Sequence, residues 1–156
     1  MRTTLKVGMT APDVGGVDQD GQPLRISALR GRWTILYFYP KDETTGCTAE
    51  ACLFRDQMEA FRDLGAEVVG VSVQDQASHE AFAKHHGLNF RLVADPDKRI
   101  TRGYEALGFL GVAKRATYVI DPGGTIRDAY RSEIDPRGHV EHARQKLREL
   151  GALAAA

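Results

Sequence analysis

Two continuous apolar runs, "WTILYFY" at residues 33–39 and "EVVGVSV" at residues 67–73, constrain the fold of this chain most strongly. Both runs are rich in aromatic or β-branched residues and lack polar alternation, a pattern typical of strands covered on both faces. A helical pattern over residues 47–64 lies between them and ends at Gly65. Two such strands joined by a helix predict a parallel pair with a right-handed crossover.

The rest of the chain continues this alternation of strands and helices. A hairpin around "DPGG" adds antiparallel strands, and a smaller hairpin is expected around Asp20-Gly21. The predicted class is therefore α/β, with a central mixed β-sheet flanked by helices on both faces. The further expected elements are a helix from Ser78 to about residue 86, a strand at 90–95, a short helix at 96–104, strands at 116–121 and 125–131, and a helix from Asp135 to Gly151.

Length and charge exclude several classes of function. The 156 residues fit a single domain over 1–156, with about 151–156 as a frayed tail. Lys and Arg number 21, as do Asp and Glu, so the net charge of zero argues against binding nucleic acid or an anionic membrane surface. No apolar run approaches the ~18 residues of a membrane span. The start "MRTTLKVGMTAPD" lacks the apolar segment of a signal peptide, so we expect a cytoplasmic protein with reduced thiols.

Both cysteines, Cys47 and Cys52, lie in the stretch "TTGCTAEAC". A disulfide between them would close a very short loop and constrain the unfolded chain little. A closed zinc site needs about four ligands, and no histidine is near the pair. An iron–sulfur cluster would require more cysteines. Redox chemistry and inert buried thiols are the remaining alternatives.

The residues around Cys47 favour the redox interpretation. If a helix starts at Cys47, free backbone N–H groups and the positive end of the helix dipole favour a thiolate there. Glu50, three residues on, occupies the position of a capping-box acid. The Thr44 hydroxyl is expected to face the same pocket, and Pro40 would form a stiff, partly dry wall.

The position of Cys52 has a mechanical consequence. Five residues apart in an α-helix, the two Cα atoms stand about 8.6 Å apart and their side chains point in different directions. A disulfide requires Cα atoms within about 7 Å. If Cys47 and Cys52 form a disulfide, the first turns of the helix must therefore unwind.

The segment "YFYPKDETTGCTAEACLFRD" is similar to the active site of peroxiredoxins, thiol peroxidases of the thioredoxin-like fold. Pro40, Thr44 and Cys47 match the family pattern Pro-x-x-x-Thr-x-x-Cys, and a second cysteine five residues on resembles the bacterioferritin comigratory protein (Q-type) branch. The resemblance covers about residues 5–150, including "GMTAPD", "VVGVSVQDQASHEAF" and "RATYVIDPGGTIR". The chain departs from the family at Thr45, where proline is usual, and in a shorter segment before Arg115.

This resemblance implies a role for each matching residue. Cys47 would attack the O–O bond of hydrogen peroxide or a small organic hydroperoxide and become a sulfenic acid. Cys52 would resolve it as an intramolecular disulfide. Thr44 would hydrogen-bond the thiolate and the peroxide, Pro40 would shield the sulfur, and Arg115 would stabilise negative charge.

The resemblance also implies the partners. Thioredoxin, or alternatively glutaredoxin, would reduce the disulfide, with no metal, haem or flavin as cofactor. Because the disulfide lies within one chain, we expect a monomer, with a weak dimer as the alternative. Lys114 and Arg91 are the other candidates for the active-site cation.

Other functions and other sites are alternatives to this interpretation. A sensor that passes its disulfide to a partner protein would use the same cysteines, whereas a non-catalytic binding module on this fold would need neither. His85 and His86 near a helix end are expected to complement the helix dipole. His139 and His142 have a spacing that could hold a metal, but no carboxylate or cysteine completes the set.

Overall fold

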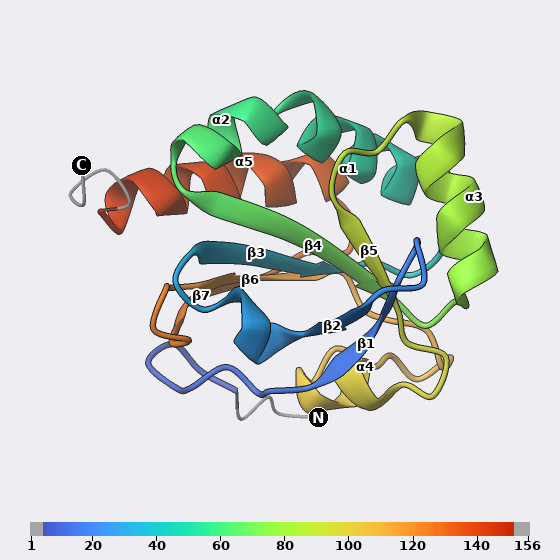
Figure 1. The fold of residues 1–156 in the computed structure, drawn as a ribbon, viewed down its shortest axis with the longest axis horizontal. Helices are drawn as coiled ribbons and strands as arrows, with labels where there is room; N and C mark the ends of the chain where they lie inside the picture. Colours follow the sequence, from blue (N-terminus) through green and yellow to red (C-terminus); the bar gives the residue numbers. More distant parts are fainter. Residues whose placement is uncertain (1–4, 152–156) are drawn as a thin grey trace.

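The computed structural model describes residues 5–151 and is built around a mixed sheet (Figure 1). Within these residues the sheet has seven strands in the order β2-β1-β5-β4-β3-β6-β7. Both predicted hairpins are present as the antiparallel pairs β1–β2 and β6–β7. The strands are β1 (Gly15–Asp18), β2 (Pro23–Arg25), β3 (Trp33–Phe38), β4 (Ala66–Ser72), β5 (Arg91–Ala94), β6 (Ala116–Ile120) and β7 (Ile126–Arg131).

The two apolar runs form the centre of the sheet, as their composition predicts. β3 and β4 are parallel and in register from the Trp33–Ala66 pair to the Phe38–Val71 pair. All but the first residue of β3 is buried. The other side of β3 pairs with β6 in the antiparallel direction, which makes the sheet mixed.

Helices cover both faces of the sheet, as expected. In Figure 1, α1, α2 and α5 lie over one face and α4 lies below the other. Each face has its own apolar core, one centred on Tyr37 and Phe54 and the other on Phe38 and Tyr118. The helices are the 3₁₀ helix η1 (Ile26–Leu29) and the α-helices α1 (Thr45–Asp56), α2 (Met58–Asp63), α3 (Gln76–His86), α4 (Arg99–Gly103) and α5 (Pro136–Glu149).

The prediction of one helix over residues 47–64 is wrong in two respects. The helix begins at Thr45, with Thr44 as its N-cap residue, and it breaks at Gln57 into α1 and α2. Gln57 has φ −105° and ψ 7°, outside the helical region. Apolar periodicity did not reveal this break, because Phe54 and Phe61 on either side of it reach the same core.

The cap of α3 also differs from the prediction. Asp75, and not Ser78, is the N-cap residue, and its carboxylate accepts a hydrogen bond from the Ser78 amide. The Ser78 hydroxyl is used elsewhere, as described below. Asp135 caps α5 and Pro136 starts it, as predicted.

The tail expected at 151–156 lies, except for Gly151, outside the described residues. None of the described helices is both long and apolar enough to cross a membrane.

Candidate active site

Cys47 lies in the first turn of α1, directly after the loop that leaves β3. Its side chain is only 1% exposed, and its thiol is free. The first intrahelical hydrogen bond runs from the Thr48 amide to the Thr44 carbonyl, so Cys47 is the third residue of the helix. This places the sulfur at the end of α1 where the backbone N–H groups are free, as predicted. The prediction started the helix at Cys47, two residues later than the structure does.

Arg115 reaches Cys47 because β6 runs antiparallel to β3. Phe38 pairs with Ala116, so the start of β6 lies beside the end of β3, where the cysteine loop begins. Arg115 is 6% exposed, and its Nη2 donates to the Cys47 Sγ at 3.4 Å. The space beside this contact is tight, because a Cβ at Gly46 would lie 3.3 Å from Nη2 and the Arg115 side chain would have to shift by a few tenths of an ångström.

Glu50 does not form the predicted capping box. The N-cap residue of α1 is Thr44, so the capping-box position three residues later is occupied by Cys47 and not by Glu50. The Glu50 side chain points into the protein. It is fully buried, and one carboxylate oxygen accepts a hydrogen bond from the Arg115 Nη1 at 2.6 Å. Its Oε2 has no hydrogen-bond partner among the described residues. Burial raises the pKa of Glu50 to about 8, although Arg115 opposes the shift.

Cys52 lies in the same helix as Cys47 and is half-buried. The helix is continuous from Thr45 to Asp56, and both thiols are free. The structure therefore holds the two cysteines in the separated arrangement expected for the reduced protein.

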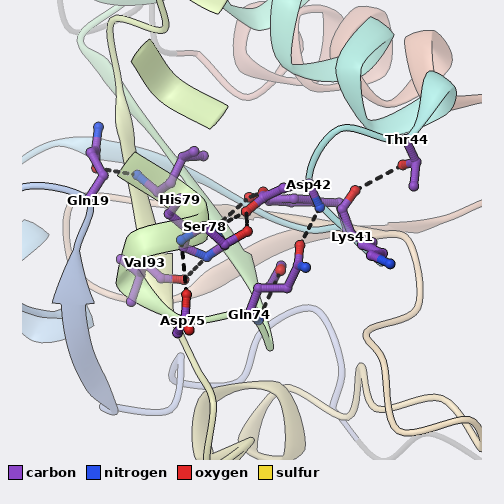
Figure 2. A network of polar contacts seen from close by, with 12 residues as sticks. Gln19, Lys41, Asp42, Thr44, Gln74, Asp75, Ser78, His79 and Val93 are labelled. Atoms are coloured by element: carbon purple, nitrogen blue, oxygen red, sulfur yellow. Dashed lines mark hydrogen bonds and ion pairs between the residues drawn. The ribbon is translucent and has the colours of Figure 1, made fainter. Parts of the chain in front are cut away.

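The structure places Thr44 and Pro40 near the cysteine loop, but in different settings. Thr44 is exposed, and its hydroxyl donates to the Lys41 carbonyl at 2.9 Å and not to Cys47 (Figure 2). Pro40 is half-buried at the end of β3. It lines an apolar hollow of about 320 Å³ together with Gly108, Phe109, Leu110, Val112, Ala113, Lys114 and Glu133.

A buried polar network holds the loop between β3 and α1 (Figure 2). Asp42 accepts hydrogen bonds from the Tyr39 hydroxyl at 2.6 Å and from the Ser78 hydroxyl at 2.7 Å. His79 Nδ1 lies 2.7 Å from the same carboxylate, and its Nε2 lies 3.1 Å from the Val93 carbonyl. Both ring nitrogens of His79 therefore face acceptor oxygens.

The charge of Asp42 is maintained by these contacts. Burial disfavours the carboxylate, but hydrogen bonds and the charge of His79, with help from Tyr39 and Ser78, hold the pKa of Asp42 below its usual value. The network thus anchors the loop to α3 at Asp42, three residues before α1 begins at Thr45. No local sequence pattern predicts this network, since Asp42 and His79 are 37 residues apart.

The other candidate residues lie elsewhere. Lys114 is exposed at the rim of the apolar hollow. Arg91 is on β5, where its Nε lies 3.8 Å from Asp18, so Arg115 is the candidate cation that contacts Cys47.

The two histidine pairs lie in different surroundings. His139 bonds Thr117 and the Ser132 carbonyl, while His142 bonds Asp128, so the structure does not bring the pair to a common ligand. His85 and His86 both contact the carboxylate of Glu43. That contact was not foreseen from their place near a helix end.

Comparison with known proteins identifies the family. The model of the AhpC/TSA family matches residues 7–129. The chain belongs to this family. It is 41% identical over 145 residues to a chloroplastic peroxiredoxin Q of Populus jackii, an alignment that covers 92% of this chain and 68% of the relative.

Solved structures agree with this assignment. The peroxidoxin BcpB of Mycobacterium tuberculosis superposes with a TM-score of 0.87 at 33% identity, covering 94% of this chain and 98% of that one. A bacterioferritin comigratory protein of Xanthomonas campestris gives a TM-score of 0.85 at 28% identity over 96% and 99% of the two chains. The fold is thioredoxin-like, and the chain is a thiol peroxidase of the peroxiredoxin Q kind, whose family reduces peroxides with thioredoxin-type reductants.

The raised pKa of Glu50 predicts a pH dependence of stability. Between its usual pKa of 4.5 and the folded value of about 8, the unfolded chain is ionised while the folded chain keeps the proton. The free energy of unfolding therefore falls as pH rises through this window, by at most about 1.4 kcal/mol per pH unit. We expect Glu50→Gln to remove part of this fall between pH 5 and 8, measured by urea unfolding. Glu59→Gln, at an exposed position of α2, is the control, and parallel curves for wild type and Glu50→Gln would contradict the shift.

Proposed function

We propose that Cys47 is the peroxidatic cysteine and that Cys52 resolves it within the same chain. The Cys47 thiolate attacks one peroxide oxygen, the O–O bond breaks, and water or an alcohol leaves as Cys47 becomes a sulfenic acid. The Cys52 thiol then attacks the Cys47 sulfur, releasing water and forming the disulfide. A dithiol reductant returns both cysteines to thiols by exchange.

The observation that carries this proposal is the contact between Arg115 and Cys47. A fixed guanidinium at 3.4 Å and the amide end of a helix are surroundings that stabilise a thiolate. The same cation would stabilise charge that develops on the peroxide oxygens, and its buried Nε has no partner among the described residues. Glu50 would orient Arg115 through the hydrogen bond to Nη1.

We assign supporting roles to Thr44 and Pro40. Thr44 would hydrogen-bond the thiolate and the peroxide, which requires its hydroxyl to leave the Lys41 carbonyl. Pro40 would keep water from the sulfur and lacks an N–H that would compete for the substrate. Both roles follow from the match of these residues to the peroxiredoxin pattern.

Resolution requires α1 to open, because the helix is continuous between the two cysteines. Their Cα atoms are about 8.6 Å apart in helical geometry, beyond the ~7 Å limit of a disulfide. The N-terminal turns of α1 would therefore unwind after oxidation. Asp42, which precedes these turns in the chain, is bonded to His79 and would stay in place. The segment that moves would therefore begin after Asp42.

We further propose that the substrates include small organic hydroperoxides as well as hydrogen peroxide. The apolar hollow at Pro40 could hold an alkyl group, and Phe109 and Leu110 at its rim are 97% and 77% exposed. The published description of the X. campestris relative names alkyl peroxide reduction for that protein. Thioredoxin is the proposed reductant, with glutaredoxin as the alternative, and we place a monomeric enzyme in the cytoplasm.

Intact mass spectrometry tests the roles of the cysteines. After peroxide treatment of the reduced protein, wild type should lose two mass units, and Cys52→Ser should gain one or more oxygens at Cys47. Cys47→Ser should stay unmodified. If Cys47→Ser is oxidised as fast as wild type, the assignment is wrong. Turnover of peroxide with a thioredoxin system separates a peroxidase from a sensor that passes on its disulfide.

The role of Arg115 predicts a loss of reactivity on substitution. In Arg115→Gln, Cys47 oxidation should slow by about 10²- to 10³-fold, the scale seen when one charge-stabilising donor is removed. The rate is measured by quenching the reaction and recording the mass. Because this change leaves Glu50 buried without its partner, the double variant Arg115→Gln/Glu50→Gln checks that the loss is not misfolding. Arg91→Gln is the matched control, and an unchanged rate in Arg115→Gln would refute the role.

The proposed unwinding predicts a change in hydrogen exchange. In the disulfide form, residues 47–53 should exchange faster than in the reduced form, whereas β3 should stay protected. Peroxide-treated Cys52→Ser, which has no resolving thiol, should not show this change. Equal protection of the helix start in both redox states of the wild type would disprove the unwinding.

A further inference from the structure

Outside the catalytic cysteines, one group of side chains has the composition of a metal site. The carboxylate of Glu43, in the loop before α1, faces two adjacent histidines in the last turn of α3. The His85 Nδ1 lies 2.9 Å from Oε2, and the His86 Nε2 lies 2.8 Å from Oε1. The three ligand atoms all lie within 4.8 Å of one another.

The backbone at Glu43 is in an unusual conformation that accompanies this arrangement. Its φ of 64° lies in the left-handed region, which is unfavourable for a residue with a Cβ by about 1–2 kcal/mol. Such a conformation persists only where surrounding contacts hold it. Those contacts come from α3, because Asp42, the preceding residue, is bonded to His79 and Ser78 of that helix (Figure 2). The loop is therefore attached to α3 at two consecutive residues, which preorganises the Glu43 carboxylate against the histidines.

The ligand types and their surroundings suit a borderline divalent cation. Two imidazoles and one carboxylate form a ligand set that zinc uses in proteins, with a fourth position left for water. Ligand atoms around tetrahedral zinc stand about 3.3 Å apart, so the two oxygen–nitrogen separations of 2.8–2.9 Å would have to open by about half an ångström. The two histidine nitrogens lie within 4.8 Å of one another. His85 and His86 end α3, where the negative end of the helix dipole favours a cation.

We propose that Glu43, His85 and His86 form a zinc-binding site that links the loop before Cys47 to the end of α3. The site is open to solvent, since the side chains of His85 and Glu43 are 65% and 45% exposed. The histidines were expected to serve only the helix dipole. Histidines that only complement a helix dipole need no common partner. Here the Glu43 carboxylate contacts both His85 and His86, as a third ligand of a shared metal ion would.

The site would also influence catalysis, a consequence that rests on the proposed function above. Glu43 directly precedes Thr44, the N-cap residue of α1, and lies four residues before Cys47. The same end of α3 is bonded to α1, because the Arg55 Nη1 donates to the His86 carbonyl at 2.6 Å. A bound zinc ion would hold the loop and α3 together and so oppose the unwinding needed for disulfide formation.

Slower resolution has a chemical consequence for Cys47. Its sulfenic acid would persist, and a second peroxide molecule could oxidise it to the sulfinic acid while being reduced to water or an alcohol. Zinc should therefore slow formation of the Cys47–Cys52 disulfide and increase the fraction of Cys47 sulfinic acid at excess peroxide.

Binding is tested first without Cys47 and Cys52, because cysteine thiolates are a common class of zinc ligand. In the Cys47→Ser/Cys52→Ser background, titration calorimetry with Zn²⁺ should show one site per chain. Glu43→Gln, His85→Ala and His86→Ala should each weaken binding at least tenfold. His142→Ala, which alters a partly buried histidine paired with Asp128 on another face, should bind as the background does. Circular dichroism confirms that every variant is folded.

The outcomes of this titration are decisive for the site. Absence of binding below about 100 μM Zn²⁺ would overturn it, as would binding in His85→Ala and His86→Ala as tight as in the cysteine-free background. Because the background lacks both cysteines, this result does not depend on whether Cys47 is peroxidatic.

The coupling to catalysis is tested in the cysteine-containing protein. Zn²⁺ should slow disulfide formation in wild type, read as the loss of two mass units, several-fold. At excess peroxide it should also raise the fraction of Cys47 sulfinic acid, read as a gain of 32 mass units. In His85→Ala/His86→Ala these rates should not respond to Zn²⁺. An equal response in that variant would show that zinc acts on the thiols and would overturn the coupling, as would an unchanged wild-type rate despite binding at the site.

Discussion

The antiparallel pairing of β6 with β3 is the constraint on which the candidate site depends. It brings the residue before β6, Arg115, to the end of β3, where the chain leaves the sheet for the cysteine loop. The guanidinium is buried between two groups, Cys47 and Glu50, and donates to both. A buried cation needs such partners, because an isolated charge in a protein interior is strongly unfavourable. Pairing of the two strands therefore determines the electrostatic surroundings of the sulfur.

The polar groups at this site are incompletely satisfied, and that is consistent with a site for chemistry. Glu50 Oε2, Arg115 Nε and the Tyr37 hydroxyl are buried without a partner among the described residues. Unpaired buried polar groups destabilise a fold, so a protein retains them at few places. Two of these groups belong to Glu50 and Arg115, which are bonded to each other beside the thiol that we propose as nucleophile. Arg115 Nε is a donor still available to a peroxide oxygen.

The loop before α1 combines rigid and mobile parts. Asp42 is held by hydrogen bonds to His79 and to the Tyr39 hydroxyl, whereas Thr44 is exposed and its hydroxyl bonds the Lys41 carbonyl of the same loop. Motion is therefore expected to start after the anchored residue, in the turns of α1 that carry Cys47. Glu43 lies between the two parts and contacts α3, so whatever binds Glu43 and the histidines also bears on how far the motion extends.

Much of this protein could be predicted from local sequence. The unbroken apolar runs predicted β3 and β4, the turn residues predicted both hairpins, and Asp135-Pro136 predicted the start of α5. The position of Cys47 at a helix start and the helical separation from Cys52 also followed from sequence, because both depend on a few neighbouring residues. Boundaries were less certain. Apolar spacing is the same on both sides of Gln57 and hides the break there, while Asp75 and Ser78 are both good caps.

Interactions between distant segments were decided only by the tertiary structure. Glu50 had the spacing of a capping acid, yet it pairs with Arg115, 65 residues away, because sheet pairing brings a buried cation to it. Asp42 and His79, and Glu43 with His85 and His86, meet because α3 packs beside the cysteine loop. The sequence by itself determined the elements and the helical separation of the two cysteines, since periodicity and spacing along the chain carry that information. Which charges meet around Cys47 depended on strand order and helix packing, which join residues that no local pattern connects.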